Sequence, residues 1–261
     1  MKIIKDLQDS HHMLENKEIT DNSMHVVVFS PPRSGSTLVY NILSELIKYT
    51  TKTHEPLSII GTEKTIIVFR DPLEWVSSYG RTIYDLSEET LCSVEEPERL
   101  WDNTGNTARD MVDQLLMPCI RKYDEMLTKM GTALNLKPTN SDCSGVEFNG
   151  RKNILCIKYE DFYKNYTYLF DQLETFLEIK ISSSKREDIK AKVNLKAVKK
   201  IEEKYSSFKD CDSISYIHGK HTCNNGDGTS HLLVGSSDMS YFKEKIKENS
   251  PSPWWRMLYP L

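Results

Sequence analysis

The chain has 261 residues, with 34 basic and 38 acidic side chains and a net charge of −4 at pH 7, and this length suits one α/β domain, 1–261. The slightly acidic composition excludes a broad nucleic-acid-binding surface, so we expect no nucleic-acid partner. No segment approaches the roughly 20 apolar residues of a membrane span, and 1–22 lack the pattern of a signal peptide, so we expect a cytoplasmic protein without a membrane partner.

The first strongly patterned segment follows a polar lead-in, 1–24, which we expect to be peripheral. Residues 25–30 hold three valines and a phenylalanine and stop at Pro31, which predicts a buried central strand. Apolar residues at three- and four-residue spacing then predict an amphipathic helix over 37–48. A strand, a loop and a helix therefore follow one another in the first fifth of the chain.

The loop between this strand and this helix has the composition of an anion site. Its small and hydroxylated residues, Ser34, Gly35, Ser36 and Thr37, allow backbone N–H groups to point at a ligand, and the start of the helix favours negative charge. Arg33 adds a permanent cation whose planar fork suits phosphate or sulfate oxygens. The loop is therefore predicted to bind an anion.

Further strands and helices alternate along the rest of the chain. Residues 49–54 predict a short strand that ends before Pro56, and 65–69 and 153–158 predict two more buried strands. Asp71 and Pro72 predict a helix start, with the helix running to about 84. The remaining predictions are helices over 107–130 (kinked at Pro118), 162–176, 182–204 and 239–247, and a long ligand-covering loop over 205–238.

This alternation predicts a three-layer α/β/α domain with a central parallel sheet. Ligands bind such sheets at the carboxyl ends of the strands, which would bring Arg33, Arg70 and Tyr159 together. Two arginines at different strand ends predict a ligand with anionic groups in two places.

The cysteines and the metal-binding residue types show no site pattern. The six cysteines are widely spaced without a CxxC pair, so we expect free thiols, with Cys156 in the core, and no metal site.

Four motifs, in this order, resemble those of the sulfotransferases that use 3′-phosphoadenosine 5′-phosphosulfate (PAPS). Arg33-Ser34-Gly35-Ser36-Thr37 resembles the family's 5′-phosphosulfate loop, with Arg33 where cytosolic members usually carry lysine. Lys52-Thr53-His54 resembles the segment whose histidine is the catalytic base in cytosolic members. Arg70 followed by Ser78 resembles the 3′-phosphate site, and Tyr159 resembles the tyrosine that contacts adenine. The resemblance covers about 26–176 and implies the P-loop-like sulfotransferase fold with PAPS as donor.

The sequence also departs from this family. The interval between the phosphate loop and His54 is much shorter than in cytosolic members, which removes material that normally helps to build the acceptor site. The basic Arg-Lys-Gly loop that binds the 3′-phosphate has no clean match, and its best candidate contains Gly219 and Lys220. The Gly-Asp-Trp ending of that region is missing.

The chemistry of sulfuryl transfer requires two functions from the protein. The acceptor must lose a proton, and histidine titrates near neutrality, so His54 is the expected general base. Charge on the leaving phosphate must be neutralised, and Lys52 and Arg33 are the expected cations. Glu55 is a rival base because some carbohydrate sulfotransferases use a glutamate. No metal is required by this scheme.

Two other functions remain open at this stage. A P-loop small-molecule kinase would need G-x-x-x-x-G-K-[ST], and the first glycine and the lysine are absent here. A non-catalytic nucleotide-binding protein also fits the loop. The acceptor, for which we favour a small molecule with a hydroxyl or an amine, is not specified by any pattern in 80–117 or 205–238.

Overall fold

The structure is a computed structural model. It describes 24–54, 63–71, 153–207 and 210–219, together with the single positions Glu74, Trp75, Ser78, Arg121, Asp124, Glu125, Thr128, Lys129, Thr222, Glu244, Lys245 and Glu248. Several predicted features lie outside these residues: positions 1–23 of the lead-in predicted over 1–24, the rival base Glu55, Lys220, and the cysteines other than Cys156 and Cys211. Most of the predicted helices over 107–130 and 239–247 also lie outside them.

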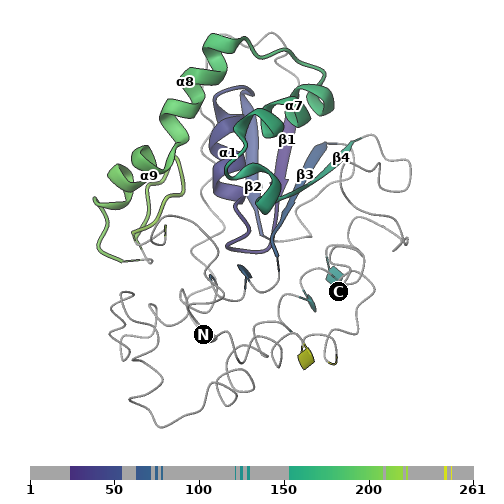
Figure 1. Cartoon of the computed structure of the whole chain (residues 1–261), viewed down its shortest axis with the longest axis vertical. Helices are drawn as coiled ribbons and strands as arrows, with labels where there is room; N and C mark the ends of the chain where they lie inside the picture. Colours follow the sequence, from purple (N-terminus) through teal and green to yellow (C-terminus); the bar gives the residue numbers. More distant parts are fainter. Residues whose placement is uncertain are drawn as a thin grey trace.

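In the part of the chain that the structure describes, the centre is a four-stranded parallel sheet with the order β2-β1-β3-β4. Its strands are β1 (His25–Phe29), β2 (Tyr49–Thr53), β3 (Lys64–Phe69) and β4 (Ile154–Lys158). All four predicted strands are confirmed, and all run in the predicted parallel sense. Figure 1 shows the sheet in purple to teal, with helices beside it.

Burial on both faces explains why three of these strands read as continuous apolar runs. Val26 and Val28 of β1 point into a core on one face, and Val27 and Phe29, which alternate with them, are also buried. β2 is an edge strand and all five of its residues are partly exposed, which agrees with its more polar sequence. The three-layer expectation therefore agrees with the burial of both sheet faces.

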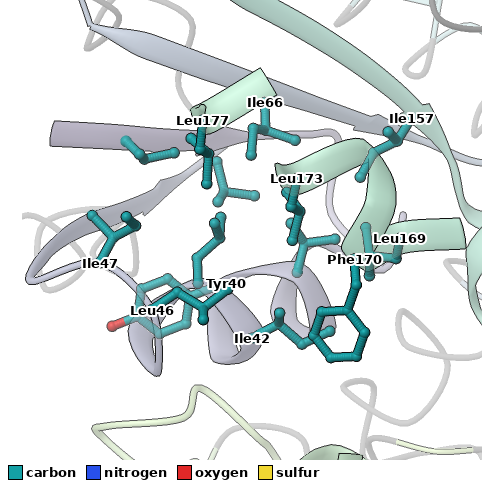
Figure 2. Close-up of a cluster of buried hydrophobic side chains, with 14 of the residues drawn as sticks. Tyr40, Ile42, Leu46, Ile47, Ile66, Ile157, Leu169, Phe170, Leu173 and Leu177 are labelled. Atoms are coloured by element: carbon teal, nitrogen blue, oxygen red, sulfur yellow. The ribbon is translucent and has the colours of Figure 1, made fainter. Parts of the chain in front are cut away.

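The core on the first face is built from the sheet and four helices, α1 (Ser36–Ser44), α6 (Tyr159–Phe162), α7 (Tyr166–Leu177) and α8 (Ser183–Val193). Figure 2 shows Ile42 of α1 beside Phe170 of α7 on one side of the cluster and Ile66 of β3 on the other, with Leu173 of α7 between them. These side chains are completely buried. Such packing fixes α1, and with it the phosphate loop, against the ends of the strands.

Two predicted helices are each divided in the structure. The segment predicted as one helix over 162–176 forms α6 (Tyr159–Phe162) and α7, because the Asn165 side chain accepts a hydrogen bond from Tyr168 N and caps a new helix. The predicted surface helix over 182–204 forms α8 and α9 (Leu195–Glu202), which meet at Asn194. Asn194 adopts an extended conformation and caps α9 through Ala197 N, 3.0 Å away.

Smaller differences concern helix ends and buried positions. α1 ends at Ser44 instead of Lys48, and α7 extends one residue beyond the predicted end, to the buried Leu177. Cys156 lies in the core, as predicted. Among the described helices, none combines the length and the apolar character that crossing a membrane requires.

Candidate functional site

The phosphate loop adopts a conformation that depends on Gly35. This glycine has φ +89° and caps the start of α1, where its carbonyl accepts from Leu38 N at 3.1 Å. A Cβ atom at this position would lie 2.2 Å from Cδ2 of Tyr159. The positive φ and the close approach of the Tyr159 ring both require glycine at this position. The absence of a side chain here also allows the loop to present its backbone N–H groups to an anion.

Two serine hydroxyl groups, one in the phosphate loop and one just after β1, form no hydrogen bond with other described residues. The side-chain oxygens of Ser30 and Ser34 are buried and have no hydrogen-bond partner among the residues that the structure describes. Buried polar atoms in folded proteins are nearly always paired, so an unpaired hydroxyl at this position suits a site that a ligand completes. Gly35 and Ser34 thus suit an anion, and their role at the 5′ end of a nucleotide stays a prediction.

Lys52 forms a hydrogen bond with this loop. Its Nζ donates to Oγ1 of Thr37 at 3.0 Å, and the register pairs Lys52 with Val28 of β1. Burial, followed by the nearby charge of Arg33, lowers the pKa of Lys52 from 10.5 to about 8, although Cys211 acts in the opposite direction. The structure therefore brings together the two cations that the sequence assigned to charge neutralisation.

His54 follows β2 and is oriented by the backbone of β1. Its Nδ1 lies 2.7 Å from the carbonyl oxygen of Ser30, and a carbonyl can only accept, so Nδ1 carries a proton. In the neutral ring, Nε2 is then the atom with the free lone pair. The Ser30 N–H in turn donates to the Thr53 carbonyl at 3.3 Å, which continues the pairing of the two strands to this point.

The environment of His54 keeps the imidazole neutral. Burial is the largest cause that lowers its pKa from 6.5 to about 4, and the charge of Lys52 and the neighbouring His218 lower the pKa further. The hydrogen bond to Ser30 acts in the opposite direction. A neutral ring with a free Nε2 can accept a proton, which a protonated ring cannot.

The predicted 3′-phosphate residues lie next to the phosphate loop. Arg33 Nε donates to the buried Oγ of Ser78 at 3.1 Å, and Arg70 Nη1 lies 3.5 Å from the Arg33 carbonyl oxygen. Arg70 also faces the carboxylates of Glu74 at 3.6 Å and Glu160 at 3.9 Å. The two predicted anion positions are therefore contiguous, and carboxylates lie near Arg70.

Tyr159 is the first residue of α6 and lies beside these groups. The guanidinium of Arg70 lies over its ring, 4.7 Å from the centroid, and Tyr163 stacks on it with centroids 4.9 Å apart. Burial raises the pKa of Tyr159, so its hydroxyl stays protonated at neutral pH. The ring is thus part of the site, and its contact with adenine stays a prediction.

The predicted covering loop is described over 205–207, 210–219 and Thr222, and its 210–219 stretch lies beside Lys52 and His54. Asp212 organises it by accepting from Ser215 N at 2.7 Å, and Cys211 pairs with His218 across the loop. Gly219 is buried, and its contacts are with Tyr205, Ser207 and Asp210, where a Cβ atom would lie 2.5 Å from the Tyr205 carbonyl oxygen. These contacts give Gly219 a packing role, and its role in 3′-phosphate binding stays a prediction.

Two residues of the site were missed by the sequence analysis. Trp75 is completely buried, and its Nε1 donates to the Pro32 carbonyl at the start of the phosphate loop. Tyr216 places its ring 5.2 Å from Nζ of Lys52. Trp75 lies about one turn into the helix that starts at Arg70-Asp71-Pro72, and an aromatic residue at that position could have been predicted to contact the phosphate loop. No sequence pattern indicates that Tyr216 belongs to the site.

No metal site is apparent in the described part of the chain, since no three His, Cys, Asp or Glu side chains gather there in a suitable cluster.

Comparison with known proteins yields structural relatives alone. No protein-family model matches the sequence, and no curated protein matches it. A crystal structure of retinol dehydratase with androsterone and the inactive cofactor PAP matches 87% of this chain and 80% of its own, with a TM-score of 0.53 and 15% identity. A second, with retinol and PAP, matches 87% and 81%, with a TM-score of 0.50 and 16% identity.

The mouse sulfotransferase SULT7A1 with PAP is also similar, with a TM-score of 0.49 and 15% identity over 89% of this chain and 86% of its own. At these identities a structural likeness establishes the fold. Together with the parallel sheet and the helices beside it, the retinol dehydratase matches show that the chain has the P-loop-like sulfotransferase fold.

Proposed function

We propose that this protein is a sulfotransferase that moves a sulfuryl group from PAPS to a hydroxyl or amine of a small-molecule acceptor. The observation that carries the proposal is the pair of contacts at the end of β2. His54 donates from Nδ1 to Ser30 and keeps Nε2 free, while Lys52 bonds to Thr37 of the phosphate loop. A base and a cation thus lie two residues apart beside an anion-binding loop.

The described residues fit a nucleotide with two anionic ends. Ser34, Gly35 and Thr37 suit the 5′ end, and Arg70 and Ser78 suit the 3′-phosphate, with Gly219 and Lys220 as further candidates. The fold likeness supports this assignment, because both retinol dehydratase complexes contain PAP together with a small molecule.

Each residue then has a defined task. PAPS, when bound, supplies a sulfuryl group whose bond to a phosphate oxygen breaks as the bond to the acceptor forms. His54 Nε2 accepts the acceptor's proton, so that the attacking atom gains the electron pair it needs. Lys52 and Arg33 neutralise the charge that develops on the departing phosphate. Backbone N–H groups from Ser34 to Thr37 hold that phosphate in place.

A screen with radiolabelled PAPS tests this function. The purified protein is offered phenols, aliphatic alcohols, amines, sugars and peptides, and transfer of label is measured for the wild type and for His54→Gln, which retains a polar side chain. We expect transfer to at least one small-molecule class and a loss of about 10²-fold or more in the variant. Full activity of His54→Gln would exclude His54 as the base and leave Glu55 as the candidate.

A binding measurement separates this function from the alternatives. PAP without metal is expected to raise the melting temperature, whereas ATP with Mg²⁺ is not. The opposite result would favour a P-loop kinase, and PAP binding without transfer to any acceptor would favour a non-catalytic nucleotide-binding protein.

A further inference from the structure

The 210–219 loop makes three connections to α1 and β2. At its tip, the Ser215 carbonyl accepts from Nδ2 of Asn41 in α1 at 3.1 Å. Beside this bond, the ring of Tyr216 meets that of Tyr40 edge to face, with centroids 5.2 Å apart. The same Tyr216 ring lies 5.2 Å from Nζ of Lys52, within the distance at which a cation and an aromatic face attract each other.

The loop is held in this shape by its own hydrogen bonds. The Asp212 carboxylate accepts from Ser215 N at 2.7 Å, Ser215 Oγ at 2.8 Å and Ile214 N at 3.1 Å, and these bonds lower the pKa of Asp212 against the effect of burial. Tyr216 N donates to the Asp212 carbonyl at 2.9 Å. The backbone of Tyr216 is therefore held by hydrogen bonds within the loop, and its ring by the contact with Tyr40.

The backbone of Tyr216 is unusual. Among the described residues, three that are not glycine have positive φ, namely Arg33 at 67°, Glu178 at 60° and Tyr216 at 55°. Glu178 caps the end of α7, where this conformation is common. Arg33 and Tyr216 instead lie on either side of Lys52 in the sequence and both act on it. Conformations of this kind cost on the order of 1 kcal/mol and concentrate at functional sites.

We propose that Tyr216 is a positioning residue for Lys52, whose ammonium group it holds beside Thr37 at the phosphate loop. The inference rests on the proposed function, because Lys52 is there the cation that acts on the departing phosphate. In this arrangement Lys52 has two fixed partners, the Thr37 hydroxyl and the Tyr216 ring. The ring stabilises the charged amine at this partly buried position, without supplying an anion that would compete with the phosphate for it.

The first test measures Lys52 itself and does not depend on activity. In protein carrying ¹³C-labelled lysine, the Lys52 signal is assigned with Lys52→Met and titrated with pH. Tyr216→Leu removes the aromatic face but keeps apolar volume, so we expect the pKa of Lys52 to fall by about 0.5–1.5 pH units. Tyr216→Phe retains the face and is expected to keep the wild-type value. An unchanged pKa in Tyr216→Leu would overturn the proposal.

The second test measures turnover. In Tyr216→Leu we expect kcat/KM for PAPS to fall about 3- to 30-fold and the alkaline limb of its pH profile to move to lower pH. In Tyr216→Phe we expect kcat/KM to stay within about twofold of wild type. Tyr168→Leu, which removes another tyrosine packed on the same core, is the control and should leave the limb in place. Equal losses in the Phe and Leu variants would show a purely structural role.

The two tests keep the proposals separable. If wild-type protein transfers no sulfuryl group, the proposed function fails, while the titration still decides whether Tyr216 acts on Lys52. If transfer is normal in Tyr216→Leu, the positioning role fails and the function stands. Should Tyr216→Leu not fold, Tyr216→Met takes its place as the non-aromatic variant, with the same expected shift.

Discussion

Arg33 donates through Nε to the hydroxyl of Ser78 at 3.1 Å, although 45 residues separate the two in the sequence. One belongs to the loop predicted to hold the 5′ end of the donor, and the other to the helix predicted to hold its 3′-phosphate. The hydrogen bond therefore links the two predicted anion positions.

Replacing Ser78 by alanine tests whether its hydroxyl distinguishes nucleotides with and without a 3′-phosphate. We expect Ser78→Ala to weaken PAP binding about tenfold or more, because a hydrogen bond to a charged group is lost, and to leave AMP binding nearly unchanged. Calorimetric titration of both nucleotides gives the ratio. Ser44→Ala, which removes a hydroxyl bonded to Tyr40 within α1, is the matched control. Equal weakening of PAP and AMP would place Ser78 outside the 3′-phosphate site.

Gly35 allows a test of the packing under the phosphate loop. Gly35→Ala is expected to reduce the free energy of unfolding by about 2–4 kcal/mol, because the new Cβ would meet the Tyr159 ring and the backbone has positive φ. Urea denaturation measures the loss. In the Tyr159→Ala background the same change should cost less, since only the backbone strain remains. Strict additivity of the two changes would contradict the close contact.

The stability of the protein should depend on His54 in mildly acidic solution. Because the pKa of His54 is lowered from 6.5 to about 4, the unfolded chain binds a proton in this interval that the folded chain does not. The free energy of unfolding should therefore fall as the pH falls from about 6.5 to 4, by on the order of 3 kcal/mol from this group. Denaturation of wild type and His54→Gln at several pH values isolates the effect, which should be absent from the variant.

The pH dependence of kcat/KM should reflect the lowered pKa values of His54 and Lys52. For the free enzyme, kcat/KM is expected to fall below about pH 4 as His54 becomes protonated, and above about pH 8 as Lys52 loses its charge. Lys52→Arg should extend the activity to higher pH, because a guanidinium stays charged there. An alkaline limb that remains near pH 8 in Lys52→Arg would assign that limb to another group.

The strands and their parallel direction were predictable because burial on both faces leaves continuous apolar runs, whereas their order in the sheet was not predicted. β1, β3 and β4 are such runs, and the residues after them were correctly expected at one edge of the sheet. Helix divisions were not predictable to the same degree, since apolar spacing continues across Asn194 and across 163–165. In both places a local side-chain cap, and not a change of periodicity, begins the new helix.

At the site, the sequence identified residues but not the way they are held. Lys52 and His54 were found through their motif, yet nothing in the motif indicates that Ser30 orients the imidazole. The contact between Tyr216 and Lys52 joins segments far apart in the chain, and it depends on a positive φ at a tyrosine, which no residue preference predicts.

Ser30 contacts the end of β2 through two main-chain groups. Its N–H donates to the Thr53 carbonyl, and its own carbonyl accepts from the His54 ring. The alignment of β1 and β2 therefore determines which ring nitrogen of His54 can act as a base. The side chain at position 30 has no part in this, because only main-chain atoms of that residue are used. Substitution there would preserve the tautomer, whereas a one-residue slip of β2 against β1 would turn the imidazole to the opposite side of the sheet.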